Sequence, residues 1–161
     1  MIDERVVLLT ESIIRPARLD DVEALHRYCY PEHAPGDVRD YLAWCLRQAE
    51  KGRIVRLVAE IEGQAVGNAQ LTVWGQDGEI GSLVVAPDFR RRGLARQLLT
   101  ELIAEATRRG LASLEISADE SQPGILAFYQ GLGFSRLPPI TDPGRREPSH
   151  PEPVVLLRML L

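Results

Sequence analysis

The sequence predicts an α/β protein with a central mixed sheet of about six or seven strands, flanked by about four helices. Segments with helical spacing of apolar residues alternate along the chain with segments of strand-like spacing. Three strand-like segments in the first half follow one another directly, which favours an antiparallel meander. A strand, a helix and a further strand come next, and this order favours a parallel pair. Antiparallel and parallel pairs in one sheet make it mixed.

The length of 161 residues fits one domain, which at this size buries roughly 70% of the surface of its unfolded chain. We assign residues 13–161 to that domain. Residues 1–12 are expected to form an N-terminal arm or an extra edge strand, because residues 6–9 are a short apolar run.

The first elements are a strand over residues 13–18 and a helix that ends near Tyr28, with Asp20 and Asp21 as its N-terminal cap. The segment 31–36 is rich in Pro and Gly and breaks the pattern. A second helix is predicted from Asp37 to near Gly52, because its apolar residues recur at helical spacing.

The meander covers residues 54–61, 65–74 and 79–85, with glycine-containing turns between them. A helix follows Gly93 and ends at Gly110, and its leucines recur at steps of four residues. Residues 111–117 form the next strand, parallel to residues 79–85.

The last elements are a helix that starts at Pro123 and ends at Leu132-Gly133, a strand from Phe134 onward, a loop over residues 138–153, and a closing strand over residues 154–161. The closing strand offers an edge on which a homodimer could form.

The charge balance excludes several classes of protein. A net charge of −4 with a pI near 5.4 argues against a nucleic-acid partner, since such domains usually carry a basic footprint. No apolar run approaches the roughly 20 residues that span a bilayer, so we expect no membrane partner. Cys29 and Cys45 lack a metal or redox spacing and are expected to be buried free thiols, which fits a cytoplasmic protein.

The segment 83–97 changes its chemistry within a few residues. An apolar strand stops at Pro87, arginines follow, and Gly93 opens an amphipathic helix. The first turn of a helix has unpaired N–H groups and a partial positive charge, so a basic turn of small residues before it is suited to an anion. We therefore predict a phosphate site. The alternative is that Arg90, Arg91, Arg92 and Arg96 are simply solvated.

Three parts of the chain resemble one known family. Val85-Ala86-Pro87 followed by Arg90-x-x-Gly93-x-Ala95 resembles the acyl-CoA-binding signature of the GCN5-related N-acetyltransferases, the GNAT family. The run 128–134, Phe-Tyr-Gln-Gly-Leu-Gly-Phe, resembles the Tyr-x-x-x-Gly-Phe end of the family's later helix, and residues 14–18 resemble its first strand. The resemblance covers residues 13–161.

The resemblance implies the GNAT acyl-CoA N-acyltransferase fold, with acetyl-CoA as cosubstrate and no metal. The pantetheine arm would lie in a gap between the strands 79–85 and 111–117, pairing with backbone as an added strand would. The pyrophosphate would meet the backbone N–H groups of residues 91–96. The implied cofactor-binding residues are Leu83, Val84, Val85, Arg90, Arg91, Arg92, Gly93, Leu94, Ala95, Arg96, Gln122 and Tyr129. Gln122 stands where the family often has an asparagine.

Tyr129 has two interpretations. An aromatic residue in an apolar helix usually belongs to the core. The resemblance implies instead that Tyr129 lies beside the cofactor sulfur and protonates the departing thiolate, a transfer that is feasible but not strongly driven, since thiols titrate near 8.5 and phenols near 10.

A general base is needed because an amine arrives mostly as an ammonium ion. Glu79 is one candidate, on the same nominal strand face as Gly81, Leu83 and Val85, although a glycine in a strand often marks a bulge. Glu115 is the other, a carboxylate in an otherwise apolar or small-residue run that matches the base of some relatives if two residues are inserted before Gln122. An ordered water, or no dedicated base, is the third alternative.

The leading hypothesis is an acetyl-CoA-dependent N-acetyltransferase in which a primary amine attacks the thioester directly in a ternary complex. A second hypothesis is a non-catalytic acyl-CoA sensor or interaction module. A nucleotide-phosphate enzyme is disfavoured because its signatures are missing. The acceptor is a small-molecule amine or a peptide or protein amine, and residues 28–39 and 138–153 are expected to decide which. His33 is a candidate acceptor contact.

Overall fold

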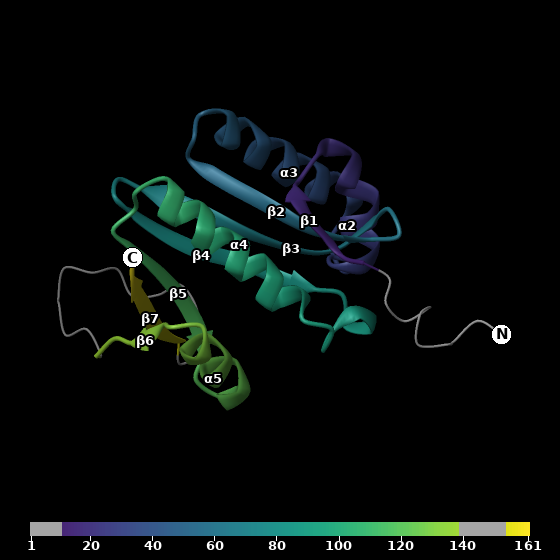
Figure 1. Cartoon of the computed structure of the whole chain (residues 1–161). Helices are drawn as coiled ribbons and strands as arrows, with labels where there is room; N and C mark the ends of the chain where they lie inside the picture. The colour runs from purple at the N-terminus through teal and green to yellow at the C-terminus, as the bar shows by residue number, and fades with distance from the viewer. Residues whose placement is uncertain (1–10, 139–153) are drawn as a thin grey trace.

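The computed structural model describes residues 11–138 and 154–161, which form one seven-stranded mixed sheet in the order β1-β2-β3-β4-β5-β7-β6 with four α-helices around it (Figure 1). The strands are β1 (Ile13–Pro16), β2 (Ile54–Ile61), β3 (Gln64–Trp74), β4 (Asp77–Val85), β5 (Ser113–Asp119), β6 (Ser135–Arg136) and β7 (Val154–Leu160). The helices are α2 (Val22–Tyr28), α3 (Pro35–Glu50), α4 (Leu94–Arg108) and α5 (Pro123–Gly131), with the short 3-10 helices η1 (Leu19–Asp21) and η2 (Pro87–Phe89). The predicted fold class is confirmed.

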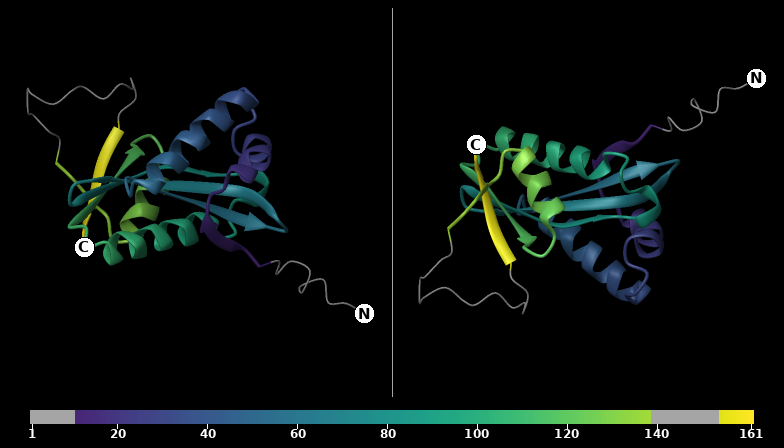
Figure 2. Two further views of the ribbon diagram at one scale, coloured as in Figure 1. Left: turned by 90° about the horizontal axis from the view of Figure 1, so that it is seen from above. Right: turned by 90° about the horizontal axis from the view of Figure 1, so that it is seen from below.

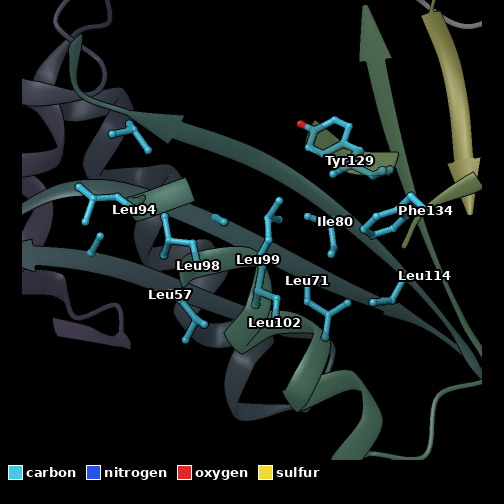
Figure 3. Close-up of a cluster of buried hydrophobic side chains, with 14 of the residues drawn as sticks. Leu57, Leu71, Ile80, Leu94, Leu98, Leu99, Leu102, Leu114, Tyr129 and Phe134 are labelled. Carbon is cyan, nitrogen blue, oxygen red and sulfur yellow. The ribbon is translucent and has the colours of Figure 1, made fainter. Parts of the chain in front are cut away.

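Two hydrophobic cores lie on opposite faces of the sheet. The helices α2 and α3 cover one face, and α4 covers the other (Figure 2). The larger core is on the α4 side and includes Leu98 and Leu102 of α4, Ile80 of β4, and Tyr129 of α5 (Figure 3). We call these the α3 face and the α4 face.

The sheet divides where β4 and β5 separate. These two strands run parallel, as predicted, and pair from Asp77 with Ser113 to Ile80 with Ile116. Beyond that point β4 continues to Val85, while β5 continues to Asp119 in antiparallel pairing with β7. The strand β7 lies at a steep angle to β2 and β3 (Figure 2). The free side of β4 between Gly81 and Val85 is therefore open to an added strand.

A β-bulge interrupts β4 just beyond the parallel pairing. Gln70 pairs with Gly81 and Asn68 with Val84, so two residues of β4 oppose one residue of β3. One of the two, Ser82, has a left-handed φ of 53°. An extra residue reverses the alternation of side chains along the strand. Two residues that a regular strand would place on the same face therefore lie on opposite faces when the bulge stands between them.

Several predicted boundaries were wrong by two residues. The helix predicted from Asp37 begins at Pro35, whose missing N–H costs nothing in a first turn. The strand predicted over residues 111–117 is Ser113–Asp119, because Leu111 still belongs to the end of α4, where its N–H donates to the Ala106 carbonyl. The strand predicted from Glu79 begins at Asp77.

Asp21 is the N-cap residue of α2, as predicted, but its side chain does not cap that helix. The Asp21 carboxylate accepts two hydrogen bonds from Arg15, at 2.7 and 2.9 Å, and one from the Arg18 backbone N–H at 2.7 Å. It gives no side-chain cap to α2. The carboxylate instead joins β1 to η1.

The end of the sheet also differs from the prediction. The strand β7 lies between β5 and the two-residue strand β6, so the closing strand is not the terminal edge offered to a second copy. A homodimer stays a prediction. The arm predicted over residues 1–12 and the loop over 138–153 lie almost wholly outside the described residues.

Candidate active site

The segment predicted to bind phosphate comprises the end of β4, η2 and the start of α4. Gly93 is the N-cap of α4 with a φ of 81°, and Arg91 has a φ of 63°. No side chain caps the helix. The first-turn N–H groups, which have no acceptor within a helix, therefore face outward beside a basic turn. This geometry suits an anion of the size of a pyrophosphate.

The arginines of this turn contact the protein as well as solvent. Arg90 Nε donates a hydrogen bond to the Val85 carbonyl at 3.0 Å. The guanidinium carbon of Arg92 lies 5.1 Å from the centre of the Phe89 ring, and that of Arg96 lies 5.7 Å from the Phe128 ring. All four predicted arginines are exposed. Their side chains are therefore held near the turn while remaining accessible to a ligand.

Tyr129 is a core residue, as the first of its two interpretations predicts. Its side chain is 7% exposed and packs against Phe128 and Phe134, with ring centres 5.7 and 6.3 Å away. Its hydroxyl group points away from Phe134 and Leu114, between the separating ends of β4 and β5 (Figure 3). Burial raises the pKa of the Tyr129 phenol, so the group keeps its proton at neutral pH. The core position thus presents a protonated hydroxyl at the division of the sheet.

The two candidate bases lie side by side. Glu79 and Glu115 are register partners across the parallel pair, in a row that continues to Thr72 on β3 and Arg158 on β7. Glu115 is partly buried and forms an ion pair with Arg158 at 2.5 Å, whereas Glu79 is exposed. The predicted parallel pair made their strands neighbours, but only the register shows that the two carboxylates are partners.

The predicted face of Glu79 was partly wrong. Register partners share a face, so Glu79 lies with Thr72 and Gly81 with Gln70, on the α3 face. Val85, beyond the bulge, contributes to the core on the α4 face. The parity argument failed because the bulge adds one residue between Gly81 and Val84.

Gln122 and His33 occupy positions consistent with their predicted roles. Gln122 is the exposed N-cap of α5, seven residues before Tyr129, and its side chain makes no capping hydrogen bond. His33 lies between α2 and α3, and its backbone carbonyl is 2.9 Å from His26 Nε2. His33 also lines a pocket of about 330 Å³ on the α3 face.

The segment 28–39, predicted to decide the acceptor, contributes Tyr30 and His33 to that pocket, but sequence reasoning missed Arg56 and Ser82. A signal was present, because Arg56 interrupts an apolar strand and two polar residues, Asn68 and Gln70, occur in the middle of the next strand. The register pairs Arg56 with Gln70. Three polar residues in strands that are otherwise apolar could have indicated a buried polar cluster.

The cysteines fit the prediction of free buried thiols. Burial raises the pKa of the Cys29 thiol to about 11, while the charge of Arg56 acts in the opposite direction. Among residues 11–138 and 154–161, no group of three or more His, Cys, Asp or Glu side chains could hold a metal ion. No helix within the described part of the chain is long and apolar enough to cross a membrane.

Comparison with known proteins decides the family. Residues 19–134 match the profile of the acetyltransferase (GNAT) family. The chain belongs to the GNAT family. The family predicted from the sequence is thereby confirmed.

Individual GNAT proteins resemble the chain to different extents. The [ribosomal protein bS18]-alanine N-acetyltransferase of Salmonella typhimurium is 33% identical over 88 residues, which are 55% of this chain and 58% of that protein. The chain therefore matches less than two thirds of the length of this curated relative.

Among solved structures, the ribosomal-protein-alanine N-acetyltransferase of Brucella melitensis has a TM-score of 0.76 and 25% identity, over 92% of this chain and 99% of that one. The PaiA N-acetyltransferase of Thermoplasma acidophilum, solved with coenzyme A, has a TM-score of 0.73 and 15% identity, over 94% and 99%. At 15% identity, the similarity to the Thermoplasma protein shows a shared fold only.

Proposed function

We propose that this GNAT protein transfers the acetyl group of acetyl-CoA to a primary amine by direct attack in a ternary complex. The observation that carries the proposal is the separation of β4 from β5 after Ile80, directly beside the uncapped N-terminus of α4. The open strand edge suits the pantetheine arm, and the anion site that follows it along the chain suits the pyrophosphate of the same cofactor.

The cofactor would use mostly backbone groups. Leu83 to Val85 would pair with the pantetheine amides, and the N–H groups of residues 91–96 would bind the pyrophosphate. The Arg90 side chain, which bonds to the Val85 carbonyl, would have to release that carbonyl if pantetheine pairs there. A similar fold solved with coenzyme A supports the assignment of the cofactor.

The reaction needs a lone pair on the amine and a proton for the sulfur. The amine nitrogen would form a bond to the thioester carbon, backbone N–H groups near Val84 or Val85 would stabilise the oxyanion, and the C–S bond would then break. Tyr129 would donate its phenolic proton to the thiolate, and the second proton lost by the amine nitrogen as the amide forms would return to the phenolate through solvent. Burial raises the pKa of the phenol, which keeps it protonated at neutral pH but also makes it a weaker acid toward the thiolate.

The carboxylates Glu79 and Glu115 would accept the proton of the ammonium ion. They lie on the α3 face, opposite the core that contains Tyr129. An acceptor on the α3 face would therefore meet the base on its own side, while the leaving sulfur would meet the acid on the other. We favour Glu115, because its ion pair with Arg158 fixes its side chain.

The experiment is to measure thiol release from acetyl-CoA with a broad panel of amines, amino acids and peptides, including a peptide that starts with alanine. We include that peptide because the similar Salmonella and Brucella proteins are named as alanine N-acetyltransferases of ribosomal proteins. We expect turnover with at least one acceptor. Binding of acetyl-CoA without turnover across the whole panel would contradict the proposal.

A further inference from the structure

The pocket on the α3 face has the position of an acceptor site. Its polar lining comes from the connection between α2 and α3, from α3 itself, and from two strands: Tyr30, His33, Asp37, Tyr41, Arg56 and Ser82. Ser82 directly precedes the segment that we propose for the pantetheine arm. A ligand in this pocket would therefore lie beside the thioester.

Arg56 is a buried charge in this pocket. Only 4% of the residue is exposed, and its Nη1 donates a hydrogen bond to Gln70 Oε1 at 2.8 Å. Its Nη2 donates to Asn68 Oδ1 and to the Tyr30 hydroxyl oxygen. Its Nε has no hydrogen-bond partner among the described residues. All of these partners are neutral.

The buried guanidinium lacks a counter-charge. No carboxylate within residues 11–138 and 154–161 forms an ion pair with Arg56. Burying a charge without an opposite charge is costly, and Arg is the residue best suited to bind a carboxylate with two parallel hydrogen bonds. An anionic group of a ligand would supply the missing charge.

The surroundings of Arg56 are already ordered. Its partner Asn68 reaches the Val84 carbonyl through Nδ2 at 3.5 Å, which connects the pocket to β4. The backbone N–H of Tyr30 donates to the Leu25 carbonyl, and that of His33 donates to the Tyr30 carbonyl. A ligand would therefore meet a preformed site rather than order a loose one.

The charges of the pocket restrict the acceptor. A polyamine would place positive charge against the buried guanidinium, which is unfavourable. Asp37, exposed at the start of α3, adds a negative charge that disfavours a ligand with two negative charges. A ligand with one negative charge and with an amine group close to that charge is compatible with both Arg56 and Asp37.

We infer that the acceptor is a small amino-carboxylate, such as a free amino acid, whose carboxylate binds Arg56 while its amine faces the separated strands. This inference rests on the proposed function for the identity of the reaction. The carboxylate site itself does not depend on turnover, so it can be tested by binding.

The test is a titration of the CoA-bound protein with the common L-amino acids and, separately, with their carboxamides. We expect at least one amino acid to bind roughly 10- to 100-fold more tightly than its carboxamide. Arg56→Met should abolish this difference and Arg56→Lys should restore part of it, while Arg47→Met, at an exposed arginine of α3, should preserve it. The comparison in the unaltered protein needs no variant, so it decides the question even if Arg56→Met does not fold.

The outcomes separate the two proposals. Equal binding of amino acids and their carboxamides overturns the acceptor inference. Acetylation of spermidine, or of a peptide that starts with alanine, without a preference for a carboxylate also overturns it. Both results leave the proposed acetyltransferase reaction untouched. Carboxylate-selective binding without thiol release from acetyl-CoA for any amine supports the site and contradicts the proposed reaction.

Discussion

The donor side and the acceptor side of this protein are built in different ways. The proposed donor site uses one continuous segment, from Leu83 to Arg96, and most of its groups are backbone N–H groups. The proposed acceptor pocket uses side chains from α2, α3, β2 and β4 and the connection between α2 and α3, and Arg56 is one of its lining residues. A site made of backbone depends on local conformation, whereas a site made of side chains depends on how distant elements pack.

The difference predicts how each side fails when it is altered. Changes on the donor side should affect every acceptor equally, because acetyl-CoA is common to all reactions. Changes on the acceptor side should affect one class of amine. Four variants make the comparison sharper, in order of their expected effect on activity.

Tyr129→Phe should have the largest effect. Removal of the proton donor is expected to lower kcat by about 100-fold or more, with little change in the affinity for acetyl-CoA, since the ring stays in the core. Steady-state kinetics and a CoA titration measure the two quantities. Tyr28→Phe is the control, because it removes a phenol whose ring packs edge-on against Phe89 and to which no proton transfer is assigned. An unchanged kcat in Tyr129→Phe would exclude the acid role.

Burial of Tyr129 also predicts a pH dependence. Because burial raises the pKa of the phenol, the alkaline loss of kcat should occur above its ordinary value of about 10. In Tyr129→Phe this alkaline limb should disappear.

Glu115→Gln should come next. We expect kcat/KM to fall by about 10- to 100-fold and the acidic limb of its pH profile to change, because an amide cannot accept the proton. Glu79→Gln should have a smaller effect, since that carboxylate is exposed and free to move. Glu101→Gln on the exposed side of α4 is the control. If Glu79→Gln lowers kcat/KM more than Glu115→Gln does, Glu79 rather than Glu115 is the base.

Gly93→Ala should weaken acetyl-CoA binding by roughly 10-fold, because a side chain at a φ of 81° costs about 1 to 2 kcal/mol. The added Cβ would meet no atom within 4 Å, so crowding is not the cause. Gly36→Ala, at an ordinary helical position of α3 with equal space, should leave the affinity unchanged. Equal effects of the two substitutions would argue against the left-handed turn as part of the donor site.

The smallest effect on activity is expected from Asp21→Asn, which should instead lower the free energy of unfolding by about 1 to 2 kcal/mol. Burial alone would raise the pKa of Asp21, but the hydrogen bonds from Arg15 and Arg18 outweigh it and lower the pKa. This stabilisation is present above the unfolded pKa near 4 and is lost as the pH falls through the lower folded value. Urea titrations at several pH values measure it. Glu105→Gln on α4, whose ion pairs are more exposed, should lose less.

The sequence by itself determined the order of the elements and the parallel pair, and it is the source of the proposed donor site. These follow from the period of apolar residues, from turn residues and from a contiguous segment, all of which are local properties. Tyr129 was also found from the sequence, through the Tyr-x-x-x-Gly-Phe pattern to which it belongs.

Only the tertiary structure decided which face each side chain occupies and what lies across from it. One extra residue at Ser82 moved Glu79 to a face other than that of Val85, and strand register brought Glu79 beside Glu115. Arg56 lies within hydrogen-bond reach of Tyr30, 26 residues away in the sequence, because β2 packs against α2 and α3. Pairing across strands and packing between layers are set by the whole chain, so no local pattern reports them.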